Sequence, residues 1–252
     1  MQIVALAKVV PDYEVPSADF ELVENRAHSR YTRMIGLYDE NAVELGVQLK
    51  EKYSADLTIV SYGPSSDVKL LRKALAMGAD KIVLVEGTSD DPYVIAANLQ
   101  AAIKTLGEVD LVLAGRQSSD MDRGVVPGVL AGMMDYIFVP QVCTVENDNG
   151  AWKVSQITET GTRVIKASGK SVLSVTSVPE NVPRIPAVRA IFAAKKKPVE
   201  KLPEIETTQK NVSEVSVEIP QIESVCEFIS AEDDIDEAVK TLLNRLKEER
   251  YL

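Results

Sequence analysis

One segment combines small, hydroxyl, acidic and basic residues in a pattern suited to phosphate binding. It reads Ala114-Gly115-Arg116-Gln117-Ser118-Ser119-Asp120-Met121-Asp122-Arg123-Gly124. Small residues let the backbone approach a ligand, and Ser or Asp side chains can cap the helix expected at about 123–133. The first N–H groups of a helix attract anions. This segment is therefore a candidate phosphate site, and an ordinary capped strand-to-helix turn is the alternative that the residues leave open.

Other familiar chemical motifs fail on inspection. The single histidine, His28, lies outside any Cys/His cluster and is expected at the surface or in a hairpin. Cys143 and Cys226 lack paired spacing and are expected to be buried thiols. Gly-Lys-Ser at 169–171 is preceded by Val164 where a P-loop needs glycine, which favours a turn between two strands. We therefore nominate no catalytic residue and no metal site.

Composition limits the classes of partner. The chain has 252 residues, 45% hydrophobic and 26% charged, as a soluble globular protein has. Its formal net charge of -10 argues against nucleic acid, which needs a basic face. Backbone N–H groups can still bind an adenine nucleotide. The N-terminus resembles a strand rather than a signal peptide, and no apolar run approaches a membrane span. A cytoplasmic location without membrane insertion is the default expectation.

The first half of the chain alternates strand and helix patterns that must position the candidate site. Strands are expected at 3–7, 57–61, 81–85 and 110–114, and helices at 39–52, 67–77 and 91–106. In the first helix we expect Asp39 as the N-cap and Glu44, Lys50 and Glu51 in water, and Gly78 should end the second helix.

Strands that are apolar on both faces and separated by helices predict a parallel sheet covered on both sides. Ligands bind outside the carboxyl ends of such strands. Residues 8–12, 62–65 and 115–122 should therefore meet on one rim.

Later segments change in character. Residues 141–146, 151–157 and 162–167 read as antiparallel strands joined by hairpin turns, and 172–175 should return to the sheet. The expected fold is a three-layer, Rossmann-like α/β domain over 1–198, mostly parallel with β-hairpin additions. Residues 199–252 are expected to be an extended arm that becomes ordered on a partner, with a helix at 233–249; a disordered tail is the alternative. That helix carries Ile235, Val239, Leu242, Leu243 and Leu246 on one side, which favours docking.

Five segments, in the same order, resemble electron-transfer flavoprotein β subunits. Gly115-Arg116-Gln117-Ser118-Ser119-Asp120 resembles the family's G-[RK]-Q-[AS]-[IS]-D, and Leu75-Ala76-Met77-Gly78-Ala79-Asp80 its ALAMGAD; the others are Ser61-Tyr62-Gly63-Pro64, Asp39-Glu40-Asn41-Ala42-Val43-Glu44 and Arg184–Lys197. The resemblance covers most of residues 1–200. It is nearest to the branch associated with anaerobic acyl-CoA, carnitine or nitrogen-fixation electron flow.

The resemblance implies a heterodimer in which an α subunit binds most of the FAD that exchanges electrons with dehydrogenases. It also implies a nucleotide site in this chain. The site residues are Leu6, Ala7, Lys8, Gly36, Leu37, Tyr38, Asp39, Tyr62, Gly115, Arg116, Gln117, Ser118, Ser119, Asp120, Met121, Asp122, Arg123, Gly124, Val125 and Val126. The ligand is AMP in simple carriers and a second FAD in the electron-bifurcating branch. We expect FAD, with AMP as the alternative.

Two further roles follow from the resemblance. Residues 185–194 should dock onto an acyl-CoA dehydrogenase-type flavoenzyme through Val188, with Ile185 and Ile191 beside it. The 199–252 arm should dock on the α subunit. Arg116 is a candidate partner for a diphosphate or for the flavin, whose anionic reduced form it would favour; pairing with Asp120 or Asp122 at the surface is the alternative.

Two other classes of function compete with that of an electron carrier that is not an enzyme by itself. An ATP pyrophosphatase or ligase of related fold needs a Gly-rich SGGxDS loop after the first strand, and residues 8–13 read Lys-Val-Val-Pro-Asp-Tyr instead. A nucleotide-binding sensor or scaffold without a redox role is the other. The long arm and the 184–197 segment favour a carrier with an obligate partner.

Overall fold

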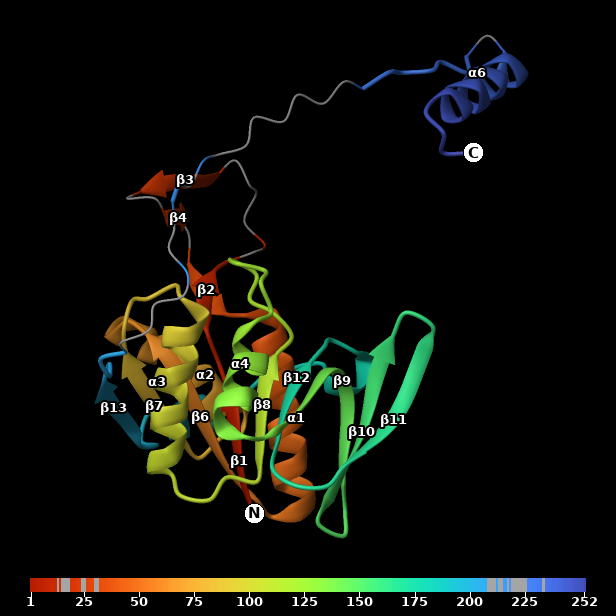
Figure 1. The fold of residues 1–252 in the computed structure, drawn as a ribbon. Coiled ribbons are helices and arrows are strands. Elements are labelled where there is room, and N and C mark those ends of the chain that lie inside the picture. Colours follow the sequence, from red (N-terminus) through yellow and green to blue (C-terminus); the bar gives the residue numbers. More distant parts are fainter. Residues whose placement is uncertain are drawn as a thin grey trace. The chain divides into compact units, whose positions relative to one another are not determined.

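The computed structural model describes residues 1–12, 14, 19–23, 26–29, 32–207, 212, 215–216, 218, 226–232 and 234–252. The chain forms two compact units, Met1–Ser216 and Val217–Leu252. Within the described residues, the first unit contains one nine-stranded sheet in the order β11-β10-β9-β12-β8-β1-β6-β7-β13 (Figure 1). Its strands are β1 (Gln2–Leu6), β6 (Asp56–Gly63), β7 (Lys81–Glu86), β8 (Leu111–Gly115), β9 (Ile137–Asp148), β10 (Ala151–Thr158), β11 (Gly161–Ala167), β12 (Ser171–Val175) and β13 (Val199–Pro203).

The parallel centre of the sheet is covered by helices on both faces, so the predicted three-layer α/β fold is confirmed. β1 lies between β6 and β8 and runs parallel to both. The helices are α1 (Leu37–Tyr53), α2 (Val68–Met77), α3 (Pro92–Thr105) and α4 (Val126–Met134). Ile3 and Ala5 belong to the core on the α1–α2 side, whereas Val4 and Leu6 belong to the core on the α3–α4 side. Alternate residues of each strand are thus buried on opposite faces.

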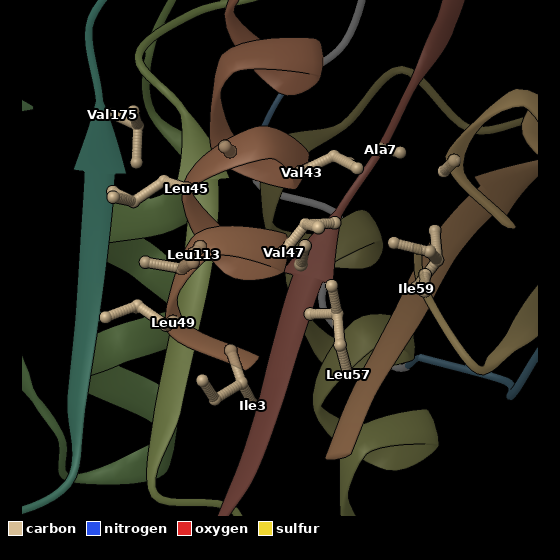
Figure 2. Close-up of a cluster of buried hydrophobic side chains, with 14 of the residues drawn as sticks. Ile3, Ala7, Val43, Leu45, Val47, Leu49, Leu57, Ile59, Leu113 and Val175 are labelled. Atoms are coloured by element: carbon tan, nitrogen blue, oxygen red, sulfur yellow. The ribbon is translucent and has the colours of Figure 1, made fainter. Parts of the chain in front are cut away.

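Helix α1 fits closely against the sheet. Figure 2 shows Val47 and Leu49 of α1 beside Ile3 and Leu57, side chains that are all almost completely buried. Burying each such side chain is worth about 1.5–3 kcal/mol. A Cβ at Gly46 would lie 3.0 Å from a methyl carbon of Leu57, so the helix has no room to move closer.

Two expectations about α1 are wrong. Its N-cap is Gly36, and Asp39 lies in the first turn with its carboxylate turned to the strand ends instead of the helix N–H groups. Glu44, expected in water, is buried, because residues 180–184 cover that side of the helix and Arg184 pairs with it. By contrast, Gly78 does end α2, at a φ of +146° that favours glycine.

The predicted hairpins are confirmed. β9, β10 and β11 pair in antiparallel fashion, and β12 returns to pair in parallel with both β8 and β9. The turn between β9 and β10 has Asn149 and Gly150 both at positive φ, as a two-residue hairpin turn requires. The Gly-Lys-Ser sequence at 169–171 lies between β11 and β12, as expected.

Several elements were missed. β13, in the segment expected to be an arm, pairs in parallel with β7 at the edge of the sheet. Two small antiparallel pairs join β2 (Val9–Pro11) to β5 (Arg33–Ile35) and β3 (Phe20–Val23) to β4 (Arg26–Ser29). His28 lies in the second pair, as the hairpin expectation requires. Short helices form at η2 (Ser65–Asp67), η3 (Pro179–Asn181) and α5 (Val188–Ala194).

The second unit contains helix α6 (Ile235–Glu248). Asp234 caps it by accepting hydrogen bonds from the N–H groups of Asp236 and Glu237. None of its residues is buried, and Ile235, Val239 and Leu242 are among its exposed apolar side chains. Cys226 is also exposed, contrary to expectation, whereas Cys143 is buried. No helix in the described parts of the chain has the length and apolar character needed to cross a bilayer.

Candidate functional site

A cleft of about 240 Å³ opens where β1, β6 and β8 reach their carboxyl ends. This is the place where an open parallel sheet binds its ligands. The sequence-predicted residues that line it are Leu6, Ala7, Lys8, Asp39, Tyr62, Gly115, Gln117, Ser118, Asp120, Met121, Arg123, Gly124, Val125 and Val126. Segments far apart in the sequence thus lie together at one site, as predicted for residues that follow the carboxyl ends of parallel strands.

Asp39 ties the floor of the cleft together. Its two carboxylate oxygens accept hydrogen bonds from the backbone N–H of Lys8, at 2.8 Å, and from that of Gly115, at 3.0 Å. These N–H groups lie just beyond β1 and at the end of β8, where the strand ladder no longer occupies them. The first turn of α1 therefore fixes the ends of both strands.

Burial raises the pKa of Asp39 to about 7, because an ionised carboxylate loses its water there. The two backbone N–H groups and the charge of Lys8 lower that pKa, and nearby Asp120 raises it slightly. Asp39 therefore changes its protonation state near neutral pH, at the floor of the cleft.

Gly115 is required where β8 meets α1. A Cβ at this position would lie 2.3 Å from a carboxylate oxygen of Asp39 and 2.8 Å from the backbone of Asp39 and Tyr38. Separations below 3.0 Å with backbone atoms leave no room for a side chain. The glycine thus permits the contact that the Asp39 hydrogen bonds need.

The loop after β8 leads into α4, whose first turn opens on the cleft. Val125 is the N-cap, and among the described residues no side chain caps this helix. At α3, which also reaches the cleft, the Asp91 carboxylate accepts from the N–H of Tyr93. Since first-turn N–H groups lack helical partners, α4 presents donors here, although not at Pro127, which has no N–H. At α3 a carboxylate occupies the corresponding position.

The basic side chains of the cleft are mostly engaged by acids. The Lys8 ammonium pairs with Asp120 at 2.7 Å. The Arg33 guanidinium pairs with Asp67 at 2.5 Å and donates to the carbonyl oxygen of Val9 at 3.0 Å. Among the described residues, Arg123 has a single long contact, of 3.5 Å, with the carbonyl oxygen of Asp90. It is the cation of this cleft with the weakest contact to the protein.

Tyr62 connects the cleft to the chain that follows β13. Its hydroxyl donates to Glu204 at 2.5 Å and accepts from the N–H of Ser89 at 2.8 Å. Burial, followed by the Glu204 carboxylate, raises the pKa of Tyr62 well above its usual value, so the hydroxyl stays protonated. The ring lies over Gly87, where a Cβ would come within 2.4 Å of it.

Some predicted residues do not line the cleft. They are Gly36, Leu37, Tyr38, Arg116, Ser119 and Asp122. The Arg116 guanidinium lies 5.5 Å from the centre of the Tyr38 ring and donates to Gln117 at 3.0 Å. Neither Asp120 nor Asp122 pairs with it among the described contacts; Asp122 binds the Gln117 amide instead. Arg116 therefore lies outside the cleft lining, against Tyr38 and Gln117.

Sequence reasoning missed the segment Gly87-Thr88-Ser89-Asp90 and the pair of Arg33 and Asp67, all of which line the cleft. The signal for the first was available. These residues follow β7, which lies next to β6 in the sheet, so the rule about carboxyl ends applies to them as well. Arg33 lies on β5, and no pattern in the sequence predicted that β5 would pair with β2.

The predicted docking residues lie on a separate surface around α5. Ile185 and Val188 are 94% and 70% exposed, and Ile191 is 47% exposed. Exposed apolar side chains that lie close together in this way are typical of an interaction surface. No group of three or more His, Cys, Asp or Glu side chains within the described residues is placed to hold a metal ion.

The chain is similar in sequence to proteins of one family. A family model described as the electron transfer flavoprotein domain matches residues 28–207. The chain is 30% identical to the electron transfer flavoprotein subunit beta of Thermoanaerobacterium thermosaccharolyticum, and the alignment covers 98% of each chain. It is 30% identical to that of Clostridium acetobutylicum over 100% of each chain. Identity to the Syntrophomonas wolfei subunit is 37% over 72% of this chain and 73% of the relative.

Proposed function

Because the chain belongs to the electron transfer flavoprotein family and matches its β subunits along nearly its whole length, we propose that it binds an adenine nucleotide in the cleft. We further propose that it works as a heterodimer with an α subunit, carrying electrons between FAD and an acyl-CoA dehydrogenase-type flavoenzyme. In this role it is a carrier subunit and not an enzyme by itself.

The observation that carries the nucleotide proposal is the uncapped first turn of α4 at the carboxyl ends of the strands. Its N–H groups, with the positive end of the helix dipole, suit a phosphate. Arg123 is close enough to the cleft to add a charge-assisted hydrogen bond. Apolar lining residues such as Ile95 and Leu99 supply a surface for the adenine ring.

The size of the cleft bears on the ligand. Small-molecule sites commonly enclose about 300–1,000 Å³, and this cleft of about 240 Å³ lies just below that range. An adenosine phosphate is the part that AMP and FAD have in common, and it is the part that suits the cleft. FAD, if bound, would supply the electron-transfer chemistry through its isoalloxazine ring. Arg116 and Tyr38, outside the lining, are then the residues available to the remainder of the molecule.

Partner binding is assigned to two other parts of the chain. We propose that the exposed apolar residues around α5 contact the dehydrogenase. The apolar side of α6, with Val239, Leu242 and Leu243 exposed, is proposed to dock on the α subunit.

The test is cofactor content. The chain is co-expressed with its adjacent α subunit, purified, denatured, and the released FAD and AMP are quantified. Two FAD per heterodimer would place a flavin in this cleft and justify an assay for electron bifurcation. One FAD and one AMP would make the protein a simple carrier. Failure to form a heterodimer, or to retain any flavin, would contradict the proposed function.

A further inference from the structure

An apolar surface with a basic border surrounds α5. Ile185, Val188, Ile191 and Phe192 are between 47% and 94% exposed. Arg189, Lys195 and Lys196 are exposed on the same short stretch, and the Lys195 ammonium lies 5.0 Å from the centre of the Phe192 ring. A basic border is unusual in a chain whose formal net charge is -10. We name residues 185–194 the docking segment.

The N-terminal end of the docking segment is held by an unusually complete set of contacts. The backbone N–H of Arg184 donates to Glu44 at 3.1 Å, and its guanidinium donates to the same carboxylate at 2.9 and 3.0 Å. The guanidinium also donates to Glu51 at 2.6 and 3.1 Å. The planar guanidinium of Arg184 can satisfy both carboxylates in one orientation only. A lysine ammonium at this position cannot make the same set of hydrogen bonds.

The acceptor of this contact is itself fixed. Burial alone would raise the pKa of Glu44, but the hydrogen bonds from Arg184 lower it below its usual value, so the carboxylate stays ionised. Gln48 donates to Glu44 at 3.1 Å and to the carbonyl oxygen of Glu180 at 3.0 Å. Just before the segment, the fully buried Asn181 is bound by Asn41 of α1 at 2.9 Å. Residues 180–184, which lead into the docking segment, are therefore held against α1.

The C-terminal end is held by α2. Arg72 donates to the carbonyl oxygen of Ala194 at 2.7 Å, and Lys197 donates to those of Leu75 and Ala79 at 3.0 and 2.5 Å. These bonds fix the C-terminal end of α5 against α2 and the residues that follow α2. Both ends of the docking segment are thus attached to rigid helices while its apolar side chains face solvent.

We propose that Arg184 is a positioning residue that holds the docking segment in its binding conformation before a partner arrives. The partner surface that fits the segment is an apolar pocket bordered by acidic side chains, because the segment is apolar with a basic border. This inference rests on the proposed function, which identifies the partner as an acyl-CoA dehydrogenase-type flavoenzyme.

Preorganisation is the physical reason. Ordering a mobile loop on binding costs free energy, whereas a segment already fixed at both ends avoids that cost. Loss of the hydrogen bonds from the Arg184 guanidinium to Glu44 and Glu51 should therefore weaken partner binding without changing the electron-transfer step. In this proposal the hydrogen-bond geometry of residue 184 matters and its charge alone does not. A lysine there should therefore weaken partner binding although it keeps the positive charge.

The test uses the flavin-loaded heterodimer with an acyl-CoA dehydrogenase as the probe. Arg184→Lys is compared with Val188→Ala. The second variant removes an exposed side chain and leaves the contacts of Arg184 with Glu44 and Glu51 intact. The readouts are hydrogen exchange of the amides at 185–194, KM and kcat for reduction of the heterodimer by the dehydrogenase, and FAD content. For Arg184→Lys we expect exchange about tenfold faster, KM about tenfold higher, and kcat and FAD content unchanged. For Val188→Ala we expect a higher KM with unchanged exchange.

The outcomes separate the two proposals. Unchanged exchange in Arg184→Lys, or faster exchange with an unchanged KM, would overturn the positioning role. An unchanged KM in Val188→Ala would contradict the docking role within the proposed function. Should Arg184→Lys lose FAD or fail to assemble, Glu51→Gln replaces it, because the Glu51 side chain is 59% exposed and its loss leaves the buried pair with Glu44 intact. A smaller change in exchange and KM together is expected there, and no change in either overturns the inference.

Discussion

Asp39 makes a pH-dependent contribution to stability. In the unfolded chain its carboxyl loses a proton near its usual pKa of 3.8, but in the folded chain it does so near 7. Between these values the folded state binds more protons, so stability falls as pH rises through this window. The difference between these two pKa values corresponds to a loss of about 4 kcal/mol in the free energy of unfolding once the pH lies above both. Asp39→Asn, which cannot ionise, should lack this slope.

Urea unfolding at pH 5, 6, 7 and 8 measures the effect of Asp39→Asn. The substitution should also remove one of the two accepted N–H bonds at every pH, at a cost of about 1–3 kcal/mol. Asp80→Asn is the control, because contacts with Lys50 and the N–H of Leu57 lower the pKa of Asp80 despite its partial burial. Its effect should be constant over this range. Parallel pH profiles for the wild type and Asp39→Asn would contradict the expectation.

Two arginines of one loop should differ in their effect on nucleotide binding. Arg123 lines the cleft, whereas Arg116 lies against Tyr38 outside it. We expect Arg123→Ala to weaken AMP binding by about tenfold, the usual cost of one charge-assisted hydrogen bond. Arg116→Ala should weaken it less than threefold, about 0.6 kcal/mol. Calorimetric titration with AMP measures both, and a larger loss in Arg116→Ala would refute this assignment.

At the residue scale, the sequence predicted which residues gather at the cleft better than what they do there. The loop after β8 was found from its small and polar residues. The role of Asp39 was not, because a carboxylate near a helix start is ordinarily a cap. Its true partners, the N–H groups of Lys8 and Gly115, come from other strands. Only their arrangement in space reveals the bond.

At the scale of elements, the close approach of β8 to α1 depends on a glycine. We expect Gly115→Ala to destabilise the chain by about 3 kcal/mol, since its Cβ would overlap Asp39 and the α1 backbone. Gly132→Ala is the matched control in α4, where a Cβ would meet no atom within 4 Å. Alanine is the better helix residue, so this variant should gain about 0.5–1 kcal/mol. Thermal and urea unfolding measure both; equal effects would show that packing at Gly115 is not limiting.

Regular elements were predictable where burial gave them a clear period. The apolar strands and the helices between them were found within a few residues of their ends. β13 was missed because it is an edge strand, short, charged and ending in Pro203, features that protect an exposed edge but hide the strand. Glu44 was misplaced because burial of that side of α1 depends on residues 180–184, which come much later in the chain.

At the scale of the whole molecule, the two units should differ in what they contribute. The first contains both hydrophobic cores, and no residue of α6 in the second is buried. We expect a chain ending at Ser216 to melt within about 2 °C of the full chain, since 1 kcal/mol corresponds to about 2–4 °C at this size. Its affinity for the α subunit should fall at least about tenfold. Calorimetry and pull-down with the α subunit test the two parts, and unchanged affinity would contradict the docking role of the arm.

The hydrogen bond from Tyr62 to Glu204 joins positions 142 residues apart, one in the cleft and one where the chain leaves β13. Such a bond has an evolutionary consequence. A change of Tyr62 to a residue without a hydroxyl removes the donor that Glu204 uses and the acceptor of the Ser89 N–H together. Lineages that alter the cleft at position 62 should then accumulate compensating changes at 204, so that the two positions covary among descendants of this chain.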